Sequence, residues 1–129
     1  MVAGALRRPN GLWMMHRRPE GKDHAGLWEF PGGKVEVSEI PVKALIRELR
    51  EELDIEVQSE HCLPAVFAQD PPESSDRPIV ILLYILEQWT GSPRALEGGK
   101  IDWFSPSQIE SLDKPPLDRD LASLLFRLV

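Results

Sequence analysis

The segment at residues 41–53, PVKALIRELREEL, most constrains how this chain can fold. Its apolar side chains recur three and four positions apart, which is the spacing of one face of an α-helix; they are Val42, Leu45, Ile46, Leu49 and Leu53. Pro41 suits the first helical position, because a helix leaves its first N–H groups unpaired in any case. The segment therefore predicts a helix that buries one face against a core.

Segments typical of strands surround this helix. Residues 2–6 and 12–16 flank Asn10 and Gly11, a pair favoured in tight turns, and predict a hairpin. Two short strands are expected around Gly32 and Gly33, with others at 62–68, 79–89 and 100–104 and a closing helix at 117–128. Strands interleaved with helices predict an α/β (α+β) fold in which helices cover both faces of a mixed sheet. We expect one domain over residues 1–129.

Charge and composition exclude several classes of partner. The formal net charge of −6 argues against binding a nucleic-acid polymer or an anionic membrane surface. The most apolar run, residues 79–86, is far shorter than the ~20 residues that span a bilayer, and the N-terminus lacks the pattern of a signal peptide. Cys62 is the single cysteine, so no intrachain disulfide can form. We expect a monomer in the cytoplasm.

The same helix also gathers Glu48, Glu51 and Glu52 on one side, where like charges three and four residues apart repel each other. One interpretation is a solvated surface on which Arg47 pairs with Glu51. The alternative is that a cation relieves the repulsion, because carboxylates are ligands that Mg²⁺ and Mn²⁺ prefer. A glycine-rich loop, with Lys34 and Glu39 beyond it, precedes the helix and favours the second interpretation, a metal and phosphate site.

These residues resemble the signature of the Nudix hydrolases. The pattern is Gly, five residues, Glu, seven residues, then Arg-Glu-apolar-any-Glu-Glu-any-Gly-apolar, and it is filled here by Gly33, Glu39, Arg47, Glu48, Leu49, Glu51, Glu52 and Ile55. Asp54 replaces the glycine that ends the helix in a left-handed conformation, at a cost of roughly 1 kcal/mol. Ile40 stands where related sequences carry a capping hydroxyl. The segments HRRPEGK, AGLWEFPGGK, EGGKIDWF and PPLDRDLASLL extend the resemblance toward the MutT group.

The resemblance implies a Nudix fold and cleavage of nucleoside triphosphates by water to a monophosphate and pyrophosphate, with Mg²⁺ or Mn²⁺ as cofactor. It implies Glu51 and Glu52 as metal ligands and Glu48 as a ligand or the base. Gly33 would add its carbonyl, and Glu97 would reach the metal from a distant loop. Arg47 and Glu39 would orient the glutamates through hydrogen bonds, which completes the expected catalytic set.

Substrate contacts are also implied. Arg18 and Lys34 are expected at the phosphates, although Arg17 or Lys22 could replace Arg18. Phe30 would border the base pocket, and Arg77 would line the nucleoside site.

Asp118 is expected to read the base, with capping of the last helix as the alternative. Because an ionised aspartate only accepts hydrogen bonds, it could bind the N1 and N2 hydrogens of a guanine or the amine of a cytosine. We therefore predict sanitation of oxidised purine triphosphates such as 8-oxo-dGTP, with CTP or 5-methyl-dCTP as the alternative substrate.

Two alternatives come from other classes of function. The chain could be a non-catalytic nucleotide-binding module on a Nudix scaffold, or its acidic helix could dock a basic protein. The other conspicuous side chains are expected to be structural: His16, His24 and His61 show no metal-ligand spacing, and Trp28, Trp89 and Trp103 suit packing.

Overall fold

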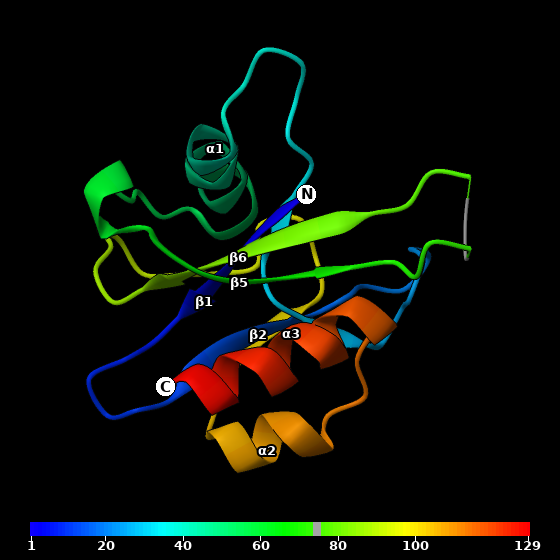
Figure 1. Ribbon diagram of the computed structural model, residues 1–129. Coiled ribbons are helices and arrows are strands. Elements are labelled where there is room, and N and C mark those ends of the chain that lie inside the picture. Colours follow the sequence, from blue (N-terminus) through cyan, green and yellow to red (C-terminus); the bar gives the residue numbers. More distant parts are fainter. Residues whose placement is uncertain (74–75) are drawn as a thin grey trace.

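The computed structural model describes residues 1–73 and 76–129. In this part of the chain the strands form two sheets (Figure 1). The first has the order β4 (Gly32–Gly33), β1 (Val2–Leu6), β6 (Val80–Leu86) and β5 (Leu63–Gln69), and the second has the order β3 (Trp28–Glu29), β2 (Trp13–Arg17) and β7 (Lys100–Phe104). The pairing of β1 with β6 is parallel and the others are antiparallel, so the strands are mixed as predicted.

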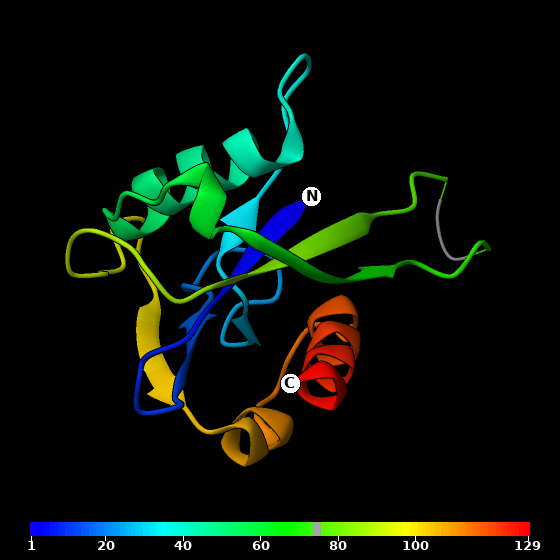
Figure 2. The same cartoon turned by 60° about the vertical axis from the view of Figure 1, so that its left-hand side comes forward.

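Helices lie on opposite sides of these strands (Figures 1 and 2). Helix α1 (Pro41–Leu53) contacts β1 and β4, whereas α3 (Pro116–Leu128) contacts β5 and also packs on the short helix α2 (Pro106–Ser111). A 3-10 turn, η1 (Ser59–His61), lies next to α1. The predicted α+β class is confirmed. None of the described helices is long and apolar enough to cross a membrane.

Strand β1 shows why the core has two halves. All five of its residues are buried, because one face packs under α1 and the other faces α3. Val2 and Leu6 join the cluster built on Leu45, Leu49 and Leu53 of α1, and Ala3 and Ala5 join the cluster that includes α3. A strand buried on both faces has no polar alternation, which explains its uniformly apolar sequence.

The predicted hairpin at residues 2–6 and 12–16 is wrong. Gly11 does make the turn, with φ of +86°, but it is followed by a single isolated bridge, between Arg7, just after β1, and Trp13, and β1 and β2 belong to different sheets. The reason is competition for partners: β4 and β6 occupy both edges of β1, and β3 and β7 occupy both edges of β2. A turn signal determines the local chain reversal but not the long-range pairing.

Helix boundaries follow the local sequence closely. Helix α1 has the predicted bounds, and Asp54 ends it in the left-handed region at φ 59° and ψ 39°. No side chain caps the helix at Ile40, as its aliphatic side chain requires. Helix α2 was not predicted, although Ser105 and Gln108 form a capping box that marks its start in the sequence.

Candidate metal and nucleotide site

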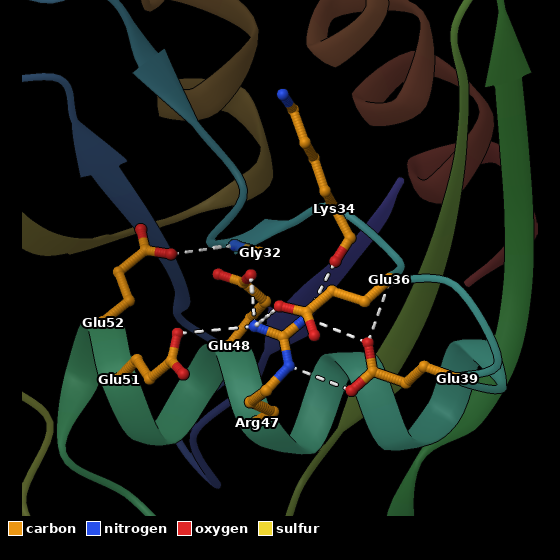
Figure 3. A network of polar contacts seen from close by, with 8 residues as sticks. All are labelled: Gly32, Lys34, Glu36, Glu39, Arg47, Glu48, Glu51 and Glu52. Atoms are coloured by element: carbon orange, nitrogen blue, oxygen red, sulfur yellow. Dashed lines mark hydrogen bonds and ion pairs between the residues drawn. The ribbon is translucent and has the colours of Figure 1, made fainter.

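Helix α1 directs two of its glutamates toward the glycine strand β4. Burial of the apolar face turns Glu48 and Glu52 to the side on which β4 passes, and Glu52 is only 7% exposed. The Gly32 N–H donates to Glu52 Oε2 at 3.2 Å (Figure 3). A Cβ on Gly33 would lie 2.3 Å from the Glu48 carboxyl carbon. Glycine at this position is what lets the backbone reach the carboxylates.

Arg47 connects most of the predicted catalytic residues (Figure 3). Its Nε and Nη2 both donate to the Glu39 carboxylate at 2.9 Å, and its Nη1 donates to Glu48 Oε1 at 2.8 Å and to Glu51 Oε2 at 3.4 Å. Nη2 also donates to the Lys34 carbonyl at 2.9 Å. Hydrogen bonding to Arg47 lowers the pKa of Glu39 to about 2. The guanidinium group of Arg47 holds the Glu48 carboxylate in one orientation. A simple surface ion pair between Arg47 and Glu51 would not do so.

The buried carboxylates carry more negative charge than the surrounding protein neutralises. Burial raises the pKa of Glu52 to about 7, and the charges of Glu29 and Glu97 add to the rise. Burial also raises the pKa of Glu48 despite the hydrogen bond from Arg47. A raised carboxylate pKa means that the ionised form lacks sufficient favourable partners. A cation would supply them.

His16, whose spacing in the sequence indicates no metal site, lies beside Glu52. It is 5% exposed on β2, its Nδ1 lies 3.5 Å from Glu52 Oε1 and 3.9 Å from Glu29 Oε1, and its Nε2 lies 3.0 Å from the Gly98 carbonyl. Burial lowers the pKa of His16, but the two carboxylates and the Gly98 carbonyl outweigh burial and leave this pKa above its ordinary value. Only tertiary structure joins these residues, which come from separate elements.

A cleft of about 190 Å³ opens above these carboxylates. Glu97 lines it together with Glu48 and Glu52, so the structure brings the distant loop to the helix. Arg18 and Lys22 also line the cleft. A larger cavity, of about 580 Å³, lies between α2 and α3 and is lined by other residues.

The predicted phosphate cations take different positions. Arg18 Nη1 donates to Glu29 Oε1 at 3.1 Å at the cleft wall, and Arg17 Nε donates to the Gly26 carbonyl at 3.2 Å. The exposed side chain of Lys34 extends away from the Arg47 network (Figure 3). Of the cations predicted to bind phosphate, Arg18 and its predicted alternative Lys22 therefore line the cleft.

Asp118 and Phe30 form a second buried group. Asp118 is 6% exposed in the first turn of α3, and its Oδ2 accepts the Phe30 N–H at 3.0 Å. Burial raises the pKa of Asp118 to about 7, and the negative charge of Glu29 contributes to the rise. The side chain of Asp118 thus joins α3 to the segment that leads into β4. Arg77 is exposed in the loop after β5, beside the undescribed residues 74–75.

An acidic helix packed against a glycine strand, beside a cleft lined by four glutamates together with Arg18 and Lys22, is the kind of site in which proteins hold a divalent metal with a phosphate. The chain belongs to the Nudix family, since the NUDIX domain matches residues 1–127. The expected family is therefore confirmed, and so is the expectation of a hydrolase.

Two relatives from Escherichia coli match nearly the whole chain. An 8-oxo-dGTP diphosphatase is 34% identical over 128 residues, which covers 99% of this chain and 96% of the relative. A CTP pyrophosphohydrolase is 35% identical over 127 residues, which covers 98% of this chain and 91% of the relative. Among solved structures, that of the E. coli ORF135 protein has a TM-score of 0.85 at 35% identity, and it covers 98% of this chain and 87% of that one. A MutT structure from a study of the Aliivibrio salmonicida and Vibrio cholerae proteins has a TM-score of 0.77 at 25% identity, with coverage of 99% and 96%.

Proposed function

We propose that this Nudix hydrolase is a Mg²⁺-dependent nucleoside triphosphate pyrophosphohydrolase that removes oxidised purine nucleotides such as 8-oxo-dGTP. The products are the nucleoside monophosphate and pyrophosphate. The observation that carries the proposal is the convergence of Glu48, Glu52 and Glu97 on one cleft beside the glycine strand. The 34% identity to an 8-oxo-dGTP diphosphatase over almost the full chain supports the choice of substrate.

The residues present fit a divalent cation. Glu52 is buried and Glu48 is partly buried, and burial raises the pKa of both carboxyls, so their ionised forms lack sufficient favourable partners. The carboxylates of Glu48, Glu51, Glu52 and Glu97 and the carbonyl of Gly33 would hold the metal. Mn²⁺ can replace Mg²⁺ in such an oxygen site. When bound, the metal neutralises phosphate charge and acidifies a water.

The protein residues position the reactants. Arg47 holds Glu48 through one carboxylate oxygen and leaves the other for a cation or a proton, so Glu48 acts as ligand or general base. Glu39 fixes Arg47 from the opposite side with two hydrogen bonds. Arg18 or Lys22 in the cleft binds phosphate oxygens, and Lys34 and Arg77 reach more exposed parts of the nucleotide.

Asp118 is proposed to select the base next to Phe30. With a pKa of about 7, the buried carboxyl is protonated in part at neutral pH, and it can then donate one hydrogen bond as well as accept others. A donor and acceptor pair suits an oxidised guanine. The ionised form only accepts and also suits the amine of cytosine, and the 35% identity to a CTP pyrophosphohydrolase favours CTP or 5-methyl-dCTP as the second candidate.

Turnover of a nucleotide panel tests the proposal. Purified protein with Mg²⁺ is given 8-oxo-dGTP, dGTP, CTP and 5-methyl-dCTP, and pyrophosphate release is measured. We expect the highest kcat/KM for 8-oxo-dGTP and loss of turnover in E52Q. Higher kcat/KM for CTP would overturn the substrate assignment. No turnover with Mg²⁺ or Mn²⁺, together with an unchanged E52Q variant, would instead indicate a non-catalytic module.

The remaining assignments follow from this function. We infer a single Nudix domain over residues 1–129 that acts as a monomer on a small nucleotide. The free, buried Cys62 is compatible with the reducing conditions of the cytoplasm, where we expect the protein to act. Gel filtration with light scattering tests the oligomeric state.

A further inference from the structure

His16 is a polar side chain buried at the base of the cleft. It is 5% exposed, and its Nδ1 has no hydrogen-bond partner among the described residues. That atom points toward Glu52 Oε1 at 3.5 Å and Glu29 Oε1 at 3.9 Å. The three ligand atoms all lie within 4.8 Å of one another.

The other ring nitrogen determines the chemistry of Nδ1. A carbonyl can only accept, so the contact of 3.0 Å between Nε2 and the Gly98 oxygen requires a proton on Nε2. The neutral ring then presents the Nδ1 lone pair to two carboxylate oxygens. Glu29 Oε1 already accepts from Arg18 Nη1 at 3.1 Å, but no described donor lies between Nδ1 and Glu52 Oε1, which therefore need a cation or a proton between them.

The Gly98–Gly99 loop is shaped to make this contact. A Cβ on Gly99 would lie 3.0 Å from His16 Nε2 and 2.1 Å from the Arg17 carbonyl oxygen, and both glycines have positive φ, +90° and +78°. Metal-binding histidines usually donate their second N–H to a carbonyl or carboxylate, which fixes the tautomer and the ring orientation. His16 already has this arrangement.

The separations also match a coordination sphere. Nitrogen and oxygen ligands lie about 2.0–2.2 Å from Zn²⁺, so neighbouring ligands around one ion are roughly 3 to 3.5 Å apart. The His16 to Glu52 distance of 3.5 Å falls at the end of this range, and the Glu29 oxygen is only slightly farther at 3.9 Å. Small side-chain movements would bring the three atoms to the separations of ligands around one ion.

We propose that His16, Glu52 and Glu29 form a mixed nitrogen and oxygen position for a divalent cation that accepts imidazole, such as Zn²⁺, Fe²⁺ or Co²⁺, in preference to Mg²⁺. Imidazole suits these metals, whereas Mg²⁺ prefers carboxylate, carbonyl and water. The position lies beside the oxygen ligands of the proposed hydrolytic site and shares Glu52 with them, so the inference rests on the proposed function.

Co²⁺ tests the position directly, because a histidine bound to it gives a strongly shifted N–H signal in the proton NMR spectrum. The Nε2–H of His16 is buried against Gly98, so it should exchange slowly enough to be seen. We expect one such signal in the wild type, and its loss in H16Q. The H16Q variant should bind Co²⁺ at least about tenfold more weakly in equilibrium dialysis, with Mg²⁺ affinity unchanged.

His61→Gln is the matched control, since it removes an imidazole that does not line the cleft and should leave the signal and both affinities unchanged. Circular dichroism checks the fold of each variant. If H16Q does not fold, the wild-type signal together with weaker Co²⁺ binding in E29Q decides the matter.

Absence of a shifted histidine N–H in the wild type, or unchanged Co²⁺ affinity in a folded H16Q, overturns the inference. Nucleotide turnover with Mg²⁺ is measured separately. Turnover without the Co²⁺ signal would refute only the mixed site, whereas the signal without turnover of any nucleotide would refute the proposed function.

Discussion

Replacing Asp118 with asparagine should stabilise the protein, and increasingly so as the pH rises. The carboxyl is 6% exposed, and its pKa is raised from 3.8 to about 7, chiefly by burial. A pKa raised on folding means that the folded state holds a proton that the unfolded state has released. The ionised carboxylate therefore costs stability, and this cost grows from about pH 4 to about pH 7 and is then constant.

The size of the effect follows from the shift. About 3 pKa units at 1.36 kcal/mol per unit give a cost of about 4 kcal/mol above pH 7. More than half of this cost develops between pH 5 and pH 8. Asparagine is neutral and keeps an oxygen to accept the Phe30 N–H, so D118N avoids the cost without losing that hydrogen bond.

Urea unfolding of both proteins at pH 5 and pH 8, in EDTA and without nucleotide, measures the difference. Subtracting the D118N curve from the wild-type curve removes the other titrating groups. D120N is the matched control, because it removes an exposed carboxylate from the same helix and leaves the contact between Asp118 and Phe30 in place. A D118N advantage that is the same at both pH values would refute the buried, protonated carboxyl.

The same variant tests base selection. If Asp118 faces the base, D118N changes the ratio of kcat/KM for 8-oxo-dGTP and CTP while kcat for the preferred substrate is largely kept. An unchanged ratio would limit Asp118 to its structural bond with Phe30.

Three further substitutions examine the acidic helix and the glycine strand β4. E52Q should reduce kcat by at least about 100-fold, which stopped assays measure. Its free energy of unfolding in EDTA at pH 8, measured by urea titration, should be unchanged or higher, because a buried charge is removed. R47K should lower kcat and also lower the free energy of unfolding, since lysine cannot make the two parallel hydrogen bonds to Glu39; the same two assays apply. G33A should lower kcat far more than the melting temperature, because its Cβ displaces the Glu48 carboxylate from a contact of 2.3 Å; calorimetry gives the melting temperature.

Exposed positions supply the controls for these variants. Arg50→Lys on the outer side of α1 and Glu60→Gln in η1 should behave like the wild type. A fully active E52Q, an R47K protein with wild-type kcat, or a G33A protein that loses stability but keeps its kcat would each contradict the arrangement of the site.

Much of the site was predictable because its signals are local. The bounds of α1, the side on which its glutamates gather and the left-handed stop at Asp54 all follow from helical spacing and backbone preference within a few residues. The pairing of Arg47 with Glu39 crosses only a short loop. The family resemblance added Glu97, whose place in the cleft no local rule would give.

The sequence by itself determined the helix, its carboxylates and the kind of chemistry they support, since periodicity and motif spacing are properties of neighbouring residues. Tertiary structure alone decided that β1 and β2 separate into different sheets, that His16 meets Glu52, and that Asp118 is buried against Phe30. These outcomes depend on competition among distant strands for hydrogen-bonding edges and on which side chains lose water when the layers close. Strand pairing and side-chain desolvation are not encoded in the spacing of residues along the chain.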